Sequence, residues 1–316
     1  MGFRVIKTAI ATLLAVMIAG AFGFKGATSA GILAILGVDV TRKRSLRTVT
    51  ARFFASLLGL FFAFMLFAIF GFHFWVLALY ILAAFPVITK AGFKEGIVTS
   101  SVVVFHVFTR AELSVQSLLT EIWLLIIGLG CAMIVNLIYM PKAESELMKI
   151  RTQVDDIYSI IFKQIAVTLR NPEYVWDGHE IIEAGEIIQQ GLTMAKKALE
   201  NQLVSPNEKW NIYFYMRRQQ LDSIQNMMQL ISQVYQKTPQ CEFVSELFEQ
   251  LSIDVKNPAY TGTTEKLLIK LEQDFKLMDL PATREEFEIR SALLQLCREL
   301  SHYLKIAKKD KTDVML

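Results

Sequence analysis

Six apolar segments crowd the first 140 residues of the chain, and they constrain its fold more than any other feature. They span roughly residues 5–23, 27–40, 53–71, 74–89, 97–108 and 118–140. Only eleven Lys or Arg and four Asp or Glu interrupt this half, whereas the second half holds 22 and 26. Because a lipid core offers no water to open backbone groups, segments that cross it must be helical.

The sequence therefore predicts an all-α protein with two parts. The first is a six-helix transmembrane bundle over residues 1–140, and the second is a cytosolic antiparallel helical bundle over residues 141–316. The first, third and sixth segments are long enough for a hydrocarbon core of about 30 Å, whereas the second and fifth are short. The first segment is about 20 residues long, which is the length that a spanning helix needs. We therefore expect it to be retained as a membrane helix rather than cleaved as a signal peptide.

The connections between these segments carry a strong asymmetry of positive charge. Lys25 and Arg110 fall on one side, and twelve other cations fall on the opposite side. Those twelve are Arg4, Lys7, Arg42, Lys43, Arg44, Arg47, Arg52, Lys90, Lys94, Lys142, Lys149 and Arg151. Since Lys and Arg are enriched in cytoplasmic loops, we expect both termini and the whole second half to lie in the cytoplasm.

The two short segments occupy corresponding positions if the six helices divide into two triplets of opposite orientation. Such a pair is a known pointer to a transport site between inverted repeats, although these helices could equally be short because neighbours shield them. Their hydroxyls include Ser29 and Ser101. Each can bind a carboxylate without adding charge, or can instead bond a carbonyl of its own helix.

Residues 141–316 have the pattern of amphipathic helices, with apolar residues every three or four positions from Leu147 to Ile165. The sequence contains no Gly-rich phosphate loop and no nucleophile elbow, and its single Glu-x-x-His pair, Glu299 with His302, is fewer than the two that a di-metal helical bundle needs. We therefore expect no enzyme, no metal site and no cofactor. Basic pairs such as Arg217-Arg218 stand among acids, which favours solvated faces over a nucleic-acid surface.

Charged and polar groups within the apolar segments are the first candidates for function, because a charge at mid-bilayer costs at least ~2.5–3.5 kcal/mol. Lys7 and Arg52 lie near the cytoplasmic boundary, where they either reach the headgroups or attract an anionic substrate. Asp39 either pairs with a following arginine or couples protons. His106 either relays protons or lies capped at the interface. Asn136 needs an interhelical partner.

Small residues recur at four-residue spacing on two of the segments. On the third segment they are Ala51, Ala55, Gly59 and Ala63, and on the first they are Ala11, Ala15, Ala19 and Gly23. Such stripes let helix backbones approach closely in lipid. They predict either packing within the chain or an interface with a second copy.

The residues Arg52-Phe-Phe-Ala55-Ser56-Leu-Leu-Gly59 resemble the Arg-x-x-Gly-Thr/Ser-x-x-Gly signature of the aromatic acid exporter and fusaric-acid-resistance superfamily. Plant aluminium-activated malate channels are similar. The layout of six spans, a basic loop and a helical C-terminal domain resembles the bacterial single-copy branch over essentially the whole chain. Ala55 replaces the usual Gly of the signature, and Asp39 stands where many members have a polar amide.

The resemblance implies export of small organic anions, a pathway near Arg52, and assembly of two six-span halves as a homodimer. We therefore expect an efflux transporter or anion channel of the bacterial inner membrane for small aromatic or other carboxylic acids. Lys7, Arg52, Ser56, Ser29, Ser101 and Asn136 are the pathway candidates, with Asp39 and His106 for proton coupling. The alternative is a membrane-anchored interaction or sensory module whose cytosolic bundle binds a partner protein. No nucleic-acid partner is expected.

Overall fold

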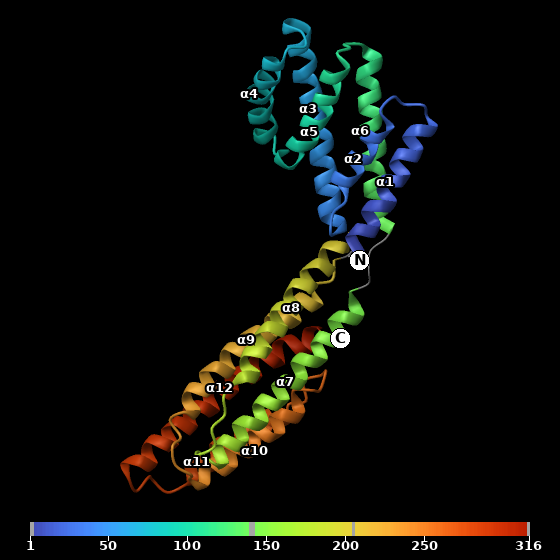
Figure 1. The fold of residues 1–316 in the computed structure, drawn as a ribbon. Helices are drawn as coiled ribbons and strands as arrows, with labels where there is room; N and C mark the ends of the chain where they lie inside the picture. Colours follow the sequence, from blue (N-terminus) through green and yellow to red (C-terminus); the bar gives the residue numbers. More distant parts are fainter. Residues whose placement is uncertain (1–2, 139–142, 204–205, 315–316) are drawn as a thin grey trace. The chain divides into compact units, whose positions relative to one another are not determined.

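The computed structural model describes residues 3–138, 143–203 and 206–314, and those residues form twelve α-helices and one short 3-10 helix (Figure 1). The chain divides into two compact units. The first is Met1–Pro141 with Glu200–Ser205, and the second is Lys142–Leu199 with Pro206–Leu316. The boundary expected between residues 140 and 141 falls outside the described residues.

The first unit contains six α-helices. They are α1 (Phe3–Ala21), α2 (Ala27–Gly37), α3 (Arg42–Phe70), α4 (Phe74–Lys90), α5 (Ile97–Arg110) and α6 (Val115–Ile138), with the 3-10 helix η1 (Lys94–Gly96) before α5. Three of them, α1, α3 and α6, are long and apolar enough to cross a membrane, and α2 and α4 are shorter apolar helices.

Helix α3 begins eleven residues earlier than the third apolar segment predicted. The hydroxyl of Thr41 accepts a hydrogen bond from the backbone N–H of Arg44 at 3.4 Å, which caps the helix. The cationic stretch from Arg42 to Arg52 is therefore the first three turns of a helix, and the expected basic loop is wrong. Its cations consequently hold fixed positions along α3.

The helices of the first unit pack as two connected groups. Helices α1, α2 and α6 contact one another, and α3 packs on α4, α5, η1 and α6. Ala55 and Ala63 on α3 are almost fully buried, and a Cβ on Gly96 would lie only 2.4 Å from the Cβ of Ala55. The small-residue stripe of α3 is thus used for packing within the chain.

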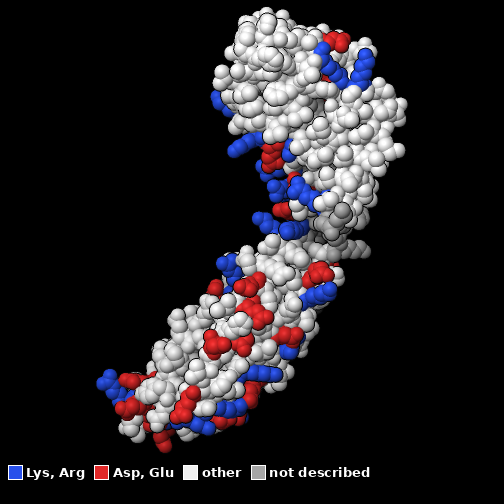
Figure 2. Space-filling model, viewed as in Figure 1, with Lys and Arg blue, Asp and Glu red and all other residues white. Residues whose placement is uncertain are grey.

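Large apolar side chains cover the outside of the first unit. They include Leu13, Met17, Phe61, Leu82 and Ile138, each at least 62% exposed. On the face drawn in Figure 2, the charged side chains of the first unit gather near its top and along its lower edge, with wide uncharged areas between them, whereas Lys, Arg, Asp and Glu are scattered over the second unit. Exposed apolar surface of this extent suits contact with lipid rather than water.

The second unit is built from six further helices. They are α7 (Glu144–Arg170), α8 (His179–Asn201), α9 (Lys209–Ile231), α10 (Pro239–Asp254), α11 (Thr263–Leu277) and α12 (Arg284–Val314). Helix α9 packs along α12, and α7 packs along α10. Phe162 lies at the centre, with its ring centroid 6.1 Å from that of Phe248 and 5.3 Å from that of Tyr303.

Arg217 in this unit is 1% exposed, so the expectation of a solvated Arg217-Arg218 face is wrong for its first member. The guanidinium pairs with the carboxylate of Asp155 and donates to the hydroxyl of Tyr213 at 3.1 Å and to Gln220 Oε1 at 2.9 Å. Burial is tolerated because the opposite charge and these acceptors replace the lost water. Burial also raises the pKa of the Tyr213 phenol, which therefore stays protonated.

Candidate functional site

Lys7 is the most deeply buried cation of the first unit, with 1% of its surface exposed. Its ammonium donates to Asn136 Oδ1 on α6 at 3.0 Å and to the backbone carbonyl of Asp39 at 3.1 Å. Asn136 in turn donates to Ser45 Oγ on α3 at 2.8 Å. The lysine therefore joins α1, α3 and α6 and does not extend outward to headgroups.

Asp39 lies beside this lysine, in the connection between α2 and α3. Its carboxylate accepts from Thr48 Oγ1 at 3.0 Å, and one oxygen lies 3.4 Å from Arg44 Nε. The sequence left two roles open for Asp39, pairing with a following arginine and proton coupling. The contact with Arg44 is the expected pairing. Thr48 Oγ1 also lies 3.1 Å from Glu95 Oε2, so two carboxylates meet at one hydroxyl.

Arg52 and Ser56 lie one turn apart on α3 and face α5. The guanidinium donates from Nη1 to Thr99 Oγ1 at 2.7 Å. Within the described residues, neither the buried Nε of Arg52 nor the fully buried Oγ of Ser56 has a hydrogen-bond partner. Because buried polar atoms are rarely left without a partner, this turn of α3 offers two groups that can bind the oxygen of an anion.

Gly59 allows two further hydroxyls to reach the same face of α3. Tyr80 on α4 and Ser100 on α5 share a hydrogen bond of 2.9 Å, and both are completely buried. A Cβ at Gly59 would lie 1.9 Å from Ser100 Oγ and 2.9 Å from the Tyr80 hydroxyl. The glycine therefore determines how closely α4 and α5 approach α3. Tyr80 was not among the predicted site residues.

A groove of about 510 Å³ opens beside the first turns of α3. It is lined by Lys43, Leu46, Arg47, Thr50, Ala51, Gly92, Phe93, Lys94 and Glu95. Three cations and a single acid give the lining an excess of positive charge, and leucine and phenylalanine supply apolar surface. A molecule with a carboxylate and an apolar body matches both properties.

A second buried ionic cluster lies at the other end of α5 and α6. Glu121 is 1% exposed, with its carboxylate 2.9 Å from His106 Nδ1 and 3.2 Å from Arg110 Nη1. Gly26 borders the cluster at φ +88°, and a Cβ there would lie 2.7 Å from Arg110 Nη2. Sequence reasoning missed Glu121, although a lone acid inside the sixth apolar segment was the available signal.

Two predicted residues stand apart from these clusters. Ser101 donates to the Ile97 carbonyl of its own helix at 3.0 Å. This bond within the helix is the alternative to binding a substrate carboxylate. Ser29 is half-buried in the first turn of α2, where its backbone N–H bonds Gly26 O. The structure brings together Lys7 with Asn136 and Arg52 with Ser56, but it does not bring Ser29 or Ser101 to either pair.

Long apolar helices, covered outside by large hydrophobic side chains and joined inside by buried cations and hydroxyls, define a helical membrane protein. Residues 1–140 match the family described as "Aromatic acid exporter family member 1", and residues 144–308 match "Putative aromatic acid exporter C-terminal domain". The chain belongs to the aromatic acid exporter family, a family of exporters rather than of enzymes. The resemblance carried by the Arg52–Gly59 signature is thereby confirmed.

Proteins similar to the chain include one from Bacillus subtilis and one of known structure. "Uncharacterized protein YqjA" of Bacillus subtilis (strain 168) is 33% identical over 307 residues, which cover 96% of this chain and 94% of that protein. The solved structure titled "Crystal structure of putative membrane protein from Clostridium difficile 630" is 21% identical, with a TM-score of 0.47. The match covers 52% of this chain and 99% of that one.

Proposed function

We propose that the protein exports small aromatic and other carboxylic acids from the cytoplasm across the inner membrane. In this proposal α1 to α6 are the six spans, and both termini lie in the cytoplasm. The observation that carries it is the Arg52–Ser56 turn, where two buried polar atoms have no partner among the described residues. Membership of an exporter family supports a small-molecule substrate.

The cationic groove beside α3 supplies the entry step. Lys43, Arg47 and Lys94 raise the local concentration of anions at the cytoplasmic mouth, and the Phe93 ring gives an aromatic body an apolar surface. Arg52 then exchanges its bond with Thr99 for a bond to the carboxylate. A guanidinium suits this step because its planar fork matches the geometry of a carboxylate.

Either of two ionic clusters could couple this movement to the proton gradient. The Asp39 carboxylate lies 3.4 Å from Arg44 Nε, and the Glu121 carboxylate lies 2.9 Å from His106 Nδ1 at the opposite end of the helices. A carboxylate that takes up a proton loses its charge and becomes a donor, so its contacts with neighbouring side chains change. An anion channel would not require either cluster to take up a proton. The dependence of uptake on a proton gradient therefore distinguishes a proton-coupled carrier from a channel.

Uptake of radiolabelled benzoate into inverted membrane vesicles tests the role of Arg52. We expect Arg52→Gln to lower uptake about 10- to 100-fold, because a hydrogen bond to a charged group contributes about 1.5–3 kcal/mol. Lys90→Gln is the matched control, since Lys90 is an exposed cation at the end of α4. Equal uptake by the two variants at equal expression would remove Arg52 from the mechanism, and no uptake by the unmodified protein would refute the function.

The homodimer implied by the family resemblance is part of the same proposal. Ala11, Ala15 and Ala19 are completely buried within the first unit, and Ala51, Ala55 and Ala63 of the α3 stripe are at most 7% exposed, whereas Gly23 is exposed. A second copy would therefore pack on the exposed apolar faces rather than on these stripes. A single cysteine is placed either at Leu13 on α1 or at Leu82 on α4, and a disulfide forms only if the same position of the second copy lies close to it. The variant that cross-links would identify the helix face used in the dimer.

A further inference from the structure

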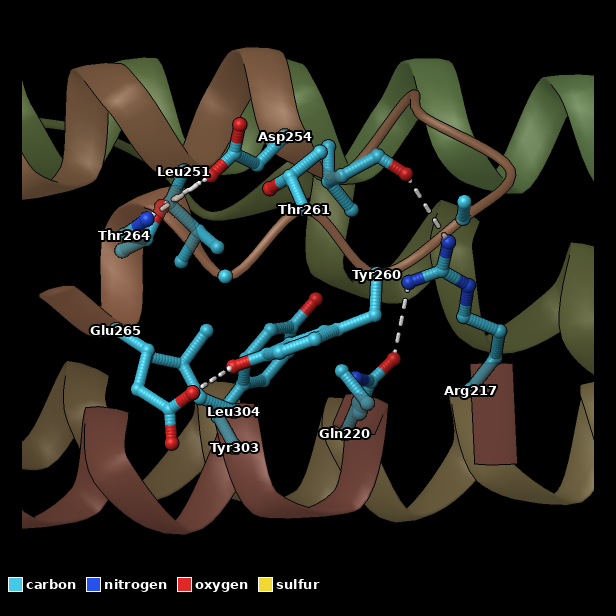
Figure 3. Close-up of a pocket in the computed structure, with 14 residues that line it drawn as sticks. Arg217, Gln220, Leu251, Asp254, Tyr260, Thr261, Thr264, Glu265, Tyr303 and Leu304 are labelled. Carbon is cyan, nitrogen blue, oxygen red and sulfur yellow. Dashed lines mark hydrogen bonds between the residues drawn. The ribbon is translucent and has the colours of Figure 1, made fainter. Parts of the chain in front are cut away.

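The cavities in the described part of the chain differ in what they can admit. A pocket inside the second unit, lined by Arg217, Tyr260 and Tyr303 among others, has a volume of about 20 Å³ (Figure 3). It has room for a single water molecule, and its guanidinium already pairs with Asp155. The groove beside the first turns of α3 measures about 510 Å³, which is within the range of sites that bind small molecules.

Three cations of this groove are available to bind an anion. Lys43 and Arg47 lie one turn apart on α3, and Lys94 opens η1. All three are exposed, and among the residues that the structure describes no hydrogen bond or ion pair engages their side chains. Glu95, the one acid of the lining, already accepts from the hydroxyl of Thr48 at 3.1 Å. The groove therefore has an uncompensated positive charge.

The cationic face of α3 continues into an exposed apolar stripe. Phe54 follows Arg47 by seven residues, Phe61 follows by seven more and Met65 by four, which keeps all of them on one face of the helix. Each of the three apolar side chains is at least 43% exposed. The ring of Phe93, which lines the groove, stacks on Phe54 with the centroids 5.5 Å apart, so the groove and the stripe are continuous.

The length of this stripe favours a lipid as the occupant. From Phe54 to Met65 it extends about 17 Å along the helix axis, close to the depth of one leaflet of a hydrocarbon core of about 30 Å. Anionic lipids are attracted to polybasic segments at the membrane surface, and basic pockets between spanning helices bind their headgroups. A small aromatic acid would contact the cations and Phe93 but would leave the stripe uncovered.

We propose that the groove binds the phosphate of an anionic phospholipid such as phosphatidylglycerol, with one acyl chain along the stripe from Phe54 to Met65. The phosphate oxygens accept from Lys43, Arg47 and Lys94. This site requires that α3 crosses the membrane, for which the helix is long and apolar enough. Because the proposed entry step uses the same cations, a bound lipid would compete with an arriving carboxylate. Only that competition rests on the proposed function.

Native mass spectrometry of the full-length protein in detergent, titrated with palmitoyl-oleoyl phosphatidylglycerol, measures the affinity of the first bound lipid. The site variant is the double substitution Lys43→Gln with Arg47→Gln. The matched control is Arg4→Gln with Lys90→Gln, which removes the same charge from exposed cations outside the groove. Phosphatidylcholine has no net charge and sn-glycerol 3-phosphate has no acyl chain, so these two are the comparison ligands.

We expect the unmodified protein to bind phosphatidylglycerol more tightly than phosphatidylcholine. Each Lys or Arg near an anionic lipid contributes about fivefold in affinity, so the site variant should bind phosphatidylglycerol about 30-fold more weakly. The control should bind it as tightly as the unmodified protein does. The two double variants should melt at the same temperature, because the removed cations of the groove have no partner within the described residues, and this result would separate a lost site from a damaged fold.

Three results would overturn the proposal. Equal affinity of the two double variants for phosphatidylglycerol would mean that positive charge acts diffusely and not at the groove. Equal binding of the two lipids by the unmodified protein would mean that the groove does not recognise the anionic headgroup. Displacement of the lipid by an equal concentration of glycerol 3-phosphate would assign the groove to a soluble phosphate ester. None of these measurements involves transport, so a failure of benzoate uptake would refute the exporter and leave the lipid site in place.

Discussion

Gly59 on α3 gives the sharpest test of the packing around the candidate pathway. A methyl group at this position would lie 1.9 Å from Ser100 Oγ and 2.9 Å from the Tyr80 hydroxyl, both of which are fully buried. Neither hydroxyl can move away without breaking their shared hydrogen bond of 2.9 Å. Gly59→Ala must therefore push α5 and α4 away from α3.

The magnitude follows from three contributions. Overpacking a buried contact costs about 1–3 kcal/mol, and loss of the hydroxyl pair costs about 1 kcal/mol more. The better helix propensity of alanine returns up to about 1 kcal/mol. We expect a net loss of about 1–3 kcal/mol in the free energy of unfolding, which for a domain of this size lowers the melting temperature by roughly 2–12 °C.

Thermal unfolding of the detergent-purified protein measures this loss, and Gly130→Ala on α6 is the matched control, because a Cβ there meets nothing within 4 Å. The double variant Gly59→Ala with Ser100→Ala should recover part of the loss, since it removes the nearest clashing atom. If Gly59→Ala melts together with Gly130→Ala, the close approach of α5 to α3 does not exist and the reasoning fails.

Three further predictions concern buried ionisable groups in both units. Glu121→Leu should lower the free energy of unfolding by about 3–5 kcal/mol, because it leaves the Arg110 guanidinium without its carboxylate and His106 Nδ1 without its partner. Glu112→Gln, at an exposed position, should leave the melting temperature unchanged. Asp155→Leu should lower the free energy of unfolding by a similar amount, because it leaves Arg217 buried without its carboxylate partner. Asp156→Ala, at a half-exposed position, should change the free energy of unfolding measured with denaturant by less than about 0.5 kcal/mol. Burial raises the pKa of Cys297 to about 12, so its folded thiol should resist iodoacetamide at pH 8 and react after unfolding. Because the unfolded thiol ionises at lower pH than the folded one, this cysteine should also reduce stability as pH rises above its ordinary pKa.

Several features of the first unit followed from local pattern. Apolar runs of about 20 residues located α1, α3 and α6, because length and hydropathy are properties of contiguous sequence. The Arg52–Gly59 signature indicated the family for the same reason. The start of α3 was missed, since a run of cations reads as a loop although Thr41 caps a helix there.

Long-range contacts account for what sequence reasoning missed. Lys7 and Asn136 are 129 positions apart, and Arg217 and Asp155 are 62 positions apart, yet each pair shares a hydrogen bond. Pattern reading assigned Arg217 to solvent because charge normally stays in water. Its burial depends on a carboxylate from another helix, which periodicity along a single helix cannot identify.

The sequence alone determined that this chain is helical, that its first half is apolar enough for lipid, and that it carries the signature of an exporter family. Only the tertiary structure decided which polar groups meet: Glu121 with His106, Ser100 with Tyr80, and Asp155 with Arg217. The physical reason is that helix formation depends on neighbours a few residues apart. The compensation of a buried charge or hydroxyl depends on side chains that folding brings from distant parts of the chain.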